Sequence, residues 1–190
     1  MSPDPHSELL QRARQGEPAA QRALYEQHAA AVLGTCVRYA RNRSEADDFA
    51  QATWMQVLTH LDQFRASGPF VGWLRQVTIT TCLQQLRQQA RRETATLPEV
   101  SAACPELVEG KGYYINATAV EDLAADELIG LIQQLPPRSR AVFNLVAVEG
   151  YSHAETGEQL SISANASRSL LKRARAMLQA AVDKLSVLCI

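Results

Sequence analysis

The 190-residue sequence predicts an all-α protein made of two small helical domains joined by a linker. Apolar residues recur at intervals of three and four along most of the chain, which is the spacing of one face of a helix. No stretch alternates apolar with polar residues as a strand does. The helical periodicity stops at 93–118, where prolines, glycines and acidic residues gather. We therefore expect domains at 1–92 and 119–190, with an acidic linker at 93–118.

The first two helices are predicted from their end signals. Ser7 is the expected N-cap of the first helix, and Gly16 ends it. Glu17-Pro18 opens a second helix, because proline suits the first helical turn. This alanine-rich helix extends to about Arg41, where the helical spacing is interrupted.

Two more helices complete the expected N-terminal domain. Ser44 is the predicted N-cap of the third helix, with acidic residues close behind it. A glycine and a proline at 68–69 precede the fourth helix, which runs from Phe70 to about Arg92. The expected apolar face of the third helix comprises Phe49, Ala52, Met55, Val57, Leu58 and Leu61.

The fourth helix carries side chains suited to nucleic acid. Its polar side has hydroxyls, amides and arginines but no carboxylate, a set that contacts phosphates and base edges. Phe70 and Trp73 stand at its start, and stacking on an unpaired base contributes ~1–3 kcal/mol. The alternative is that both aromatic residues belong to the core.

Helices are also expected at 119–134 and 138–149, and a helix-turn-helix pattern follows them. Ser152 and Glu155 have the spacing of a capping box, and this first helix ends at Leu160. After a three-residue turn, Ser163 is the expected cap of a second helix that runs past Met177. In DNA-binding proteins this arrangement places the second helix in the major groove.

Charge is segregated along the chain although the net charge is −1. Acidic residues are absent from 65–92 and from 161–182, whereas the linker is rich in them. Four basic side chains of the last helix lie off its apolar stripe: Arg168, Lys172, Arg173 and Arg175. An acid-free basic face suits a polyanion, because the local field decides the contact. The alternative is a solvated helix on an ordinary bundle.

Several functional classes are not expected. The four cysteines are far apart and are interpreted as free thiols, and the four histidines have no ligand spacing, so no metal or cofactor is predicted. No catalytic constellation is present, which argues against an enzyme. The sequence contains no run of eighteen apolar residues and no signal peptide at its start, so we expect a cytoplasmic protein without a membrane span.

Motifs in both halves give the sequence a resemblance to a known family. The chain resembles bacterial RNA polymerase sigma factors of the extracytoplasmic-function (ECF) group, whose segments occur here in the family's order. The matching stretches are EPAAQRALY at 17–25, EADDFAQ at 45–51, LDQFR at 61–65, FVGWL at 70–74, LPPRSRAVF at 135–143, EGYS at 149–152 and RAR at 173–175.

The resemblance implies a promoter-specificity subunit with sigma region 2 before the linker and sigma region 4, the helix-turn-helix, after it. The implied partners are core RNA polymerase (its β′ clamp helices and β-flap), promoter DNA and an anti-sigma factor. Core polymerase binding is implied for Asp48, Phe49 and Gln51. Recognition of the −10 element is implied for Phe64, Phe70, Trp73, Thr80, Gln84 and Arg87. Recognition of the −35 element is implied for Arg168, Ser169, Lys172, Arg173 and Arg175.

Departures from the family pattern keep alternatives open. Ala52 replaces a usual glutamate, and Thr80 and Gln84 replace an asparagine and an aspartate. These changes motivate a second hypothesis, a degenerate sigma-like regulator that keeps the fold. A third hypothesis is a free-standing helix-turn-helix repressor whose N-terminal half dimerises. Self-inhibition by the acidic linker is a further hypothesis.

Overall fold

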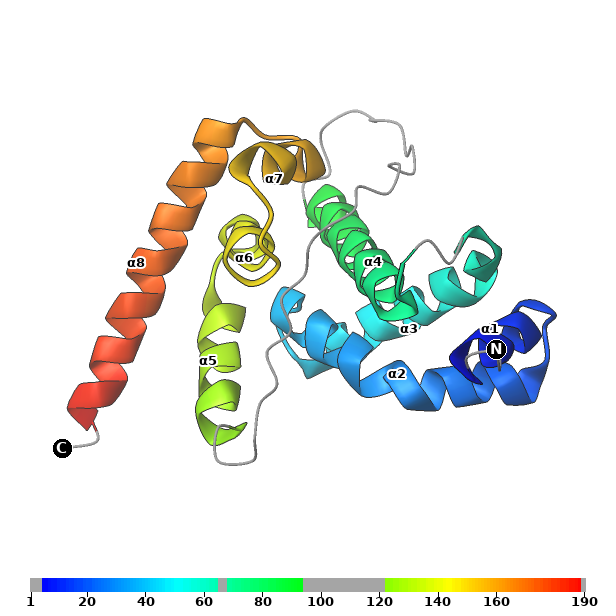
Figure 1. The fold of residues 1–190 in the computed structure, drawn as a ribbon. Coiled ribbons are helices and arrows are strands. Elements are labelled where there is room, and N and C mark those ends of the chain that lie inside the picture. Colours follow the sequence, from blue (N-terminus) through cyan, green and yellow to red (C-terminus); the bar gives the residue numbers. More distant parts are fainter. Residues whose placement is uncertain (1–4, 65–67, 94–121, 189–190) are drawn as a thin grey trace.

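The structure is a computed structural model that describes residues 5–64, 68–93 and 122–188 (Figure 1). Every regular element within these ranges is helical, which confirms the predicted all-α class. The predicted linker, apart from Glu93 at the end of a helix, lies outside the described residues.

The N-terminal helices are α1 (Pro5–Arg14), α2 (Pro18–Tyr39), α3 (Arg43–Thr59), the short 3-10 helix η1 (Leu61–Gln63) and α4 (Phe70–Glu93). Helix α2 packs against α1, α3 and α4. The core between them contains fully buried apolar and aromatic side chains, among them Leu24, Val32, Tyr39, Phe49, Val57 and Leu83.

The C-terminal helices are α5 (Asp122–Gln134), α6 (Pro137–Phe143), the π-helix η2 (Asn144–Val148), α7 (His153–Leu160) and α8 (Ala164–Leu188). The long helix α8 runs along one side of the molecule and packs against α5, α6 and α7 (Figure 1). A small apolar cluster joins α5 to α8 and consists of Ile132, Leu135, Ala174 and Leu178.

Two predicted N-caps are wrong. Helix α3 begins two residues earlier than expected, because the side-chain oxygen of Asn42 accepts a hydrogen bond from the backbone N–H of Glu45 at 3.0 Å. Asparagine caps a helix as well as serine does, so Ser44 lies inside the helix. Helix α1 likewise starts at Pro5 rather than after Ser7, as proline in a first turn permits.

The helix predicted at 138–149 contains a change of helical type. Helix α6 starts at Pro137 and passes at Asn144 into the π-helix, and the N–H of Glu149 donates to the carbonyl of Asn144 at 2.9 Å. A bond five residues back widens the turn, and such segments are frequent at functional sites.

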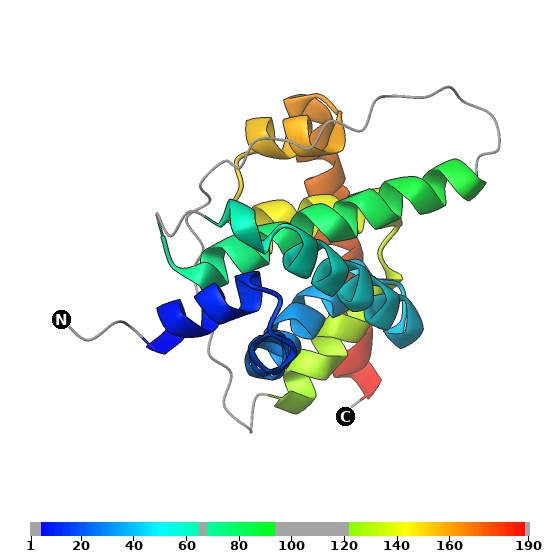
Figure 2. The ribbon, with the colours of Figure 1, turned by 90° about the vertical axis from the view of Figure 1, so that its right-hand side faces the viewer.

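The N-terminal and C-terminal helices pack directly on each other. Ala141 and Leu145 belong to the same buried cluster as the core of α1–α4, and Tyr151 and Leu160 pack against that cluster. Figures 1 and 2 both show α6 and α7 beside α4. No sequence pattern predicted this contact.

Candidate nucleic-acid interface

Helices α7 and α8 form the predicted helix-turn-helix. The capping box is confirmed: Ser152 Oγ accepts from the N–H of Glu155 at 3.2 Å, and the N–H of Ser152 donates to the carboxylate of Glu155 at 2.7 Å. Ser161 ends α7 in the left-handed conformation, with φ of 54°. Ser163 accepts from the N–H of Ala166 at 3.1 Å and so caps α8, as predicted.

A polar contact fixes the two helices against each other. His153 Nδ1 lies 2.9 Å from Ser167 Oγ, and the Ser167 side chain is fully buried. Leu171 and Ala174 continue the same buried face of α8. One side of α8 is therefore held by α7, and the opposite side faces solvent.

All five residues implied for −35 recognition are exposed on α8. Arg168, Lys172 and Arg175 follow one another at intervals of four and three residues, so they share one stripe of the helix. Ser169 and Arg173 lie beside that stripe. Arg168 Nη1 donates to Asn165 Oδ1 at 2.7 Å, which orients the first arginine. The arrangement suits a helix whose N-terminal half enters a groove lined by phosphates.

The aromatic residues implied for −10 recognition form one cluster. The ring centroids of Phe64, Phe70 and Trp73 lie 5.5–5.8 Å apart. Phe64 and Phe70 are buried, and Trp73 is half-buried. In this conformation the rings of Phe64 and Phe70 contact other aromatic groups instead of solvent.

Two residues that the sequence did not single out complete this cluster. The His28 ring lies 5.4 Å from Phe70. The Arg14 guanidinium lies over the ring of Phe64 at 5.7 Å, donates to the carbonyl of Leu61 at 3.0 Å and also donates to the carbonyl of Phe64. Arg14 thus ties the end of η1 to α1. Only the fold brings these side chains together, because they come from α1, α2, the end of η1 and α4.

The remaining residues implied for −10 recognition lie along α4. Thr80 and Gln84 are half-buried, and Arg87 is exposed. Gln76, Thr80 and Arg87 share one stripe of the helix, and the C-terminal helices contact both of its ends. The Tyr151 hydroxyl donates to Gln76 Oε1 at 2.5 Å, and Arg87 Nη2 donates to the carbonyl of Gln159. Partial desolvation of the Arg87 guanidinium group, and secondarily the charge of Arg91, lowers the pKa of Arg87.

The residues implied for polymerase binding lie on α3. Asp48 and Gln51 are exposed, and Phe49 is buried behind them. Met55 and Leu58 belong to the expected apolar face of α3, but they are exposed, at 66% and 39%. The intervals of three, four and three residues place Asp48, Gln51, Met55 and Leu58 on one stripe of α3. An exposed apolar stripe beside charged groups is typical of a protein-binding surface.

Tyr25 extends this apolar surface onto α2. Its side chain is 50% exposed, and its ring centroid lies 5.0 Å from that of Trp54. Among the departures from the family pattern, Ala52 is half-buried on α3. We call the exposed side chains of Tyr25, Asp48, Gln51, Met55 and Leu58 the α3 surface.

Nothing in the described part of the chain suggests a metal centre: it holds no group of three or more His, Cys, Asp or Glu residues placed to bind an ion. Cys36 and Cys82 are buried free thiols, and Cys82 Sγ donates to Cys36 Sγ at 3.8 Å. That hydrogen bond lowers the pKa of Cys36 and, together with burial, raises the pKa of Cys82. Cys104 and Cys189 lie outside the described residues. Within the described ranges, no helix has the length and hydropathy of a membrane span.

Comparison with known proteins finds matches to both halves of the chain. Residues 24–92 match the family model for Sigma-70 region 2, and residues 125–178 match that for Sigma-70, region 4. ECF RNA polymerase sigma factor SigE of Mycolicibacterium smegmatis is 30% identical over 157 residues, which are 82% of this chain and 59% of that protein. RNA polymerase sigma-H factor of Pseudomonas aeruginosa is 27% identical over 183 residues, with 94% of both chains covered.

Two solved structures have a similar chain. CnrH, in complex with the cytosolic domain of CnrY, has a TM-score of 0.46 at 24% identity, with 93% of this chain and 96% of that chain covered. The sigma factor RpoE from Bartonella quintana, in complex with the anti-sigma factor NepR, has a TM-score of 0.49 at 16% identity, with 85% of this chain and 96% of that chain covered.

The two region matches together cover more than half of the chain and occur in the family's order. The chain therefore belongs to the sigma-70 family of RNA polymerase sigma factors, in its extracytoplasmic-function group.

Proposed function

We propose that this protein binds core RNA polymerase and directs it to a specific set of promoters. The observation that carries the proposal is the presence, on one chain, of two separate surfaces in the family's order. One is the α3 surface within the region 2 match, and the other is the basic stripe of α8 within the region 4 match. The polymerase supplies the chemistry, so the protein itself acts as an initiation factor and works in the cytoplasm.

Each surface has a proposed partner. The α3 surface binds the β′ clamp helices through Asp48 and Gln51, with Phe49 packed behind them. The region 4 domain binds the β-flap and reads the −35 element with Arg168, Ser169, Lys172, Arg173 and Arg175. Helix α4 and the aromatic cluster read and open the −10 element with Phe64, Phe70, Trp73, Thr80, Gln84 and Arg87. In this division the domains extend over 1–92 and 119–190, and residues 93–118 link them.

Opening of the −10 element needs a change at the aromatic cluster. Holding a base out of the stack costs a few kcal/mol per step, and stacking on an aromatic ring offsets part of that cost. Phe64 and Phe70 are covered by each other and by His28 and Arg14. We expect the half-buried Trp73 to be the first of these rings that an extruded base reaches.

The test for polymerase binding compares two neighbouring aspartates of α3. Asp48→Ala removes a proposed clamp contact. Asp47→Ala is the matched control, because Asp47 is exposed on the same helix and pairs with Arg43 at 3.1 Å. We expect Asp48→Ala to weaken binding to core polymerase about tenfold, and Asp47→Ala to leave it within about twofold. Equal effects of both variants would contradict the assignment of this surface.

The alternative functions make different predictions. A free-standing repressor binds duplex DNA tightly as a symmetric dimer without polymerase. A degenerate sigma-like regulator binds polymerase but does not initiate transcription. Ala52→Glu restores the side chain usual in the family, and a rise in polymerase affinity and transcription would identify Ala52 as a weak point. An anti-sigma factor stays a prediction of the family resemblance.

A further inference from the structure

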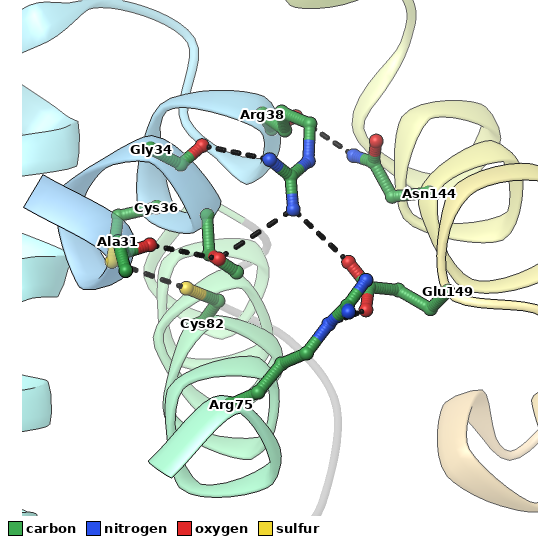
Figure 3. A network of polar contacts seen from close by, with 9 residues as sticks. Ala31, Gly34, Cys36, Arg38, Arg75, Cys82, Asn144 and Glu149 are labelled. Carbon is green, nitrogen blue, oxygen red and sulfur yellow. Dashed lines mark hydrogen bonds and ion pairs between the residues drawn. The ribbon is translucent and has the colours of Figure 1, made fainter. Parts of the chain in front are cut away.

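One buried carboxylate joins the two halves of the molecule. The Glu149 side chain, at the end of the π-helix, is 2% exposed. Its two oxygens pair with two arginines of the N-terminal helices: Arg38 Nη2 of α2 at 3.1 Å and Arg75 Nε of α4 at 2.5 Å. Figure 3 shows both guanidinium groups directed at this carboxylate. These arginines precede Glu149 by 111 and 74 residues, so the contact exists only in the folded chain.

Arg38 is held in place by its own helix and by the C-terminal half of the molecule. Arg38 Nη1 donates to the carbonyl of Gly34 at 3.1 Å, and the carbonyl of Arg38 accepts from Asn144 Nδ2 at 2.8 Å. Both arginine side chains are about a quarter exposed, at 24% and 23%. Two oriented guanidinium groups around one pair of oxygens form an anion site. The planar N–H donors of arginine also match the oxygens of a phosphate.

This anion site lies beside the stripe of α4 that we propose for −10 DNA. Arg75 is followed directly by Gln76, whose Oε1 accepts from Tyr151. At the far end of the stripe, Arg87 donates to the Gln159 carbonyl of α7. The C-terminal half therefore engages polar groups at three points along α4, where it competes with DNA for the same groups.

We propose that Arg38 and Arg75 form a phosphate-binding site for the DNA backbone, and that Glu149 occupies this site in the closed form. The carboxylate of Glu149 takes the place of a backbone phosphodiester, so the helix-turn-helix half must move away before α4 binds DNA. This inference rests on the proposed function and adds to it a residue-level competition between the protein and its promoter.

The consequence is measurable in the full chain without polymerase. When a closed form competes with binding, the apparent dissociation constant equals the intrinsic one divided by the fraction of protein in the open form. Glu149→Gln keeps the shape and removes the charge, so it weakens the closed form. Glu158→Gln is the matched control, since it makes the same charge change at an exposed position of α7.

The probe is a fluorescein-labelled single-stranded DNA of fifteen mixed nucleotides, followed by anisotropy. We expect Glu149→Gln to bind it about tenfold more tightly than the unaltered protein, and Glu158→Gln to stay within about twofold. Tyr151→Phe removes the bond to Gln76 but keeps the ring, and it should give an intermediate gain. The proposed competition would be overturned if Glu149→Gln and Glu158→Gln bound the DNA with equal affinity and Tyr151→Phe bound it as the unaltered protein does.

The phosphate site itself is tested by removing Arg75 in the opened protein. The double variant Glu149→Gln, Arg75→Gln should lose the affinity gained by the single variant. The slope of log binding constant against log salt concentration should be shallower by about 0.7 for the double variant than for Glu149→Gln, which is the value for one phosphate contact on a single strand. A slope equal to that of Glu149→Gln would overturn the phosphate site. Polymerase binding is measured separately. If the protein showed these DNA effects but bound no polymerase, the proposed function would be refuted and the phosphate site would stand.

Discussion

An ideal Cβ atom at Gly157 would lie 2.7 Å from the carbonyl oxygen of Ile162. Gly157 is buried in α7, and Ile162 belongs to the turn that follows it. The N–H of Ile162 donates back to the carbonyl of Gly157 at 2.9 Å. The turn thus folds tightly over α7 where a side chain would obstruct it. Glycine inside a helix costs about 1 kcal/mol relative to alanine, and this close approach explains its presence.

Substitution Gly157→Ala should therefore destabilise the protein, although alanine favours helix. We expect a loss of about 1–2 kcal/mol in the free energy of unfolding, because the backbone of the turn must shift. Gly130→Ala is the control, since no atom beyond its chain neighbours and the backbone of α5 lies within 4 Å of its added methyl group. Urea unfolding should show a gain for Gly130→Ala. A comparable gain for Gly157→Ala would contradict the close approach.

Thr156 offers the opposite case, a position that is open to stabilisation. Its side chain is fully buried, and Oγ1 has no hydrogen-bond partner within the described structure. Valine has nearly the same shape and no hydroxyl, so Thr156→Val should raise the free energy of unfolding by about 1 kcal/mol. Thr53→Val is the comparison, because the buried Thr53 hydroxyl donates to the Phe49 carbonyl at 2.8 Å. That variant should gain nothing, and an equal gain at both sites would refute the argument.

The capping box makes stability depend on pH. Hydrogen bonds from the side chain and backbone of Ser152 lower the pKa of Glu155 below its ordinary 4.5. A lowered carboxyl pKa contributes stability above 4.5, and the contribution is lost as the pH falls through the folded-state pKa.

Glutamine keeps the cap geometry without the charge, so Glu155→Gln isolates this electrostatic part. We expect the unaltered protein to be more stable by about 0.5 kcal/mol near neutral pH, with the difference vanishing under acid conditions. Thermal unfolding between pH 2 and 7 measures it. Glu158→Gln is the control for the loss of one negative charge at an exposed position. A stability difference between the unaltered protein and Glu155→Gln that grew as the pH fell would contradict the prediction.

The α3 surface predicts that an exposed apolar side chain affects binding and leaves stability unchanged. Met55→Ala should change the free energy of unfolding by less than about 0.5 kcal/mol and weaken polymerase binding about tenfold. Leu128→Ala is the control, because Leu128 is similarly exposed on α5. A stability loss at Met55 of about 2 kcal/mol or more would mean that it is a core residue after all.

Local signals explain what the sequence predicted well. The capping box of Ser152 and Glu155 and the cap at Ser163 each join atoms a few residues apart, and the structure confirms both. The cap of α3 was assigned to Ser44 because the sequence does not distinguish it from the equally suitable Asn42. Periodicity also failed at Met55, since an exposed apolar stripe has the same spacing as a buried one.

Long-range contacts account for what could not be predicted. The bond of Glu149 to Arg75 depends on how two halves pack, and no local pattern encodes it. The same holds for Arg14 over Phe64, because α1 and the end of η1 meet only in the fold. The family resemblance places the functional segments in order along the chain, whereas the closed arrangement emerges from the structure alone.

The most direct test of promoter-directing activity is transcription by core RNA polymerase mixed with the purified protein on a library of promoter sequences. We expect stable binding to the core enzyme and initiation at a defined set of promoters that share a −35 and a −10 element. Arg173→Ala should change which −35 sequences in the library support initiation, and should affect the choice of −10 sequences less. Absence of both binding and initiation, for the unaltered protein and for Glu149→Gln, would contradict the account.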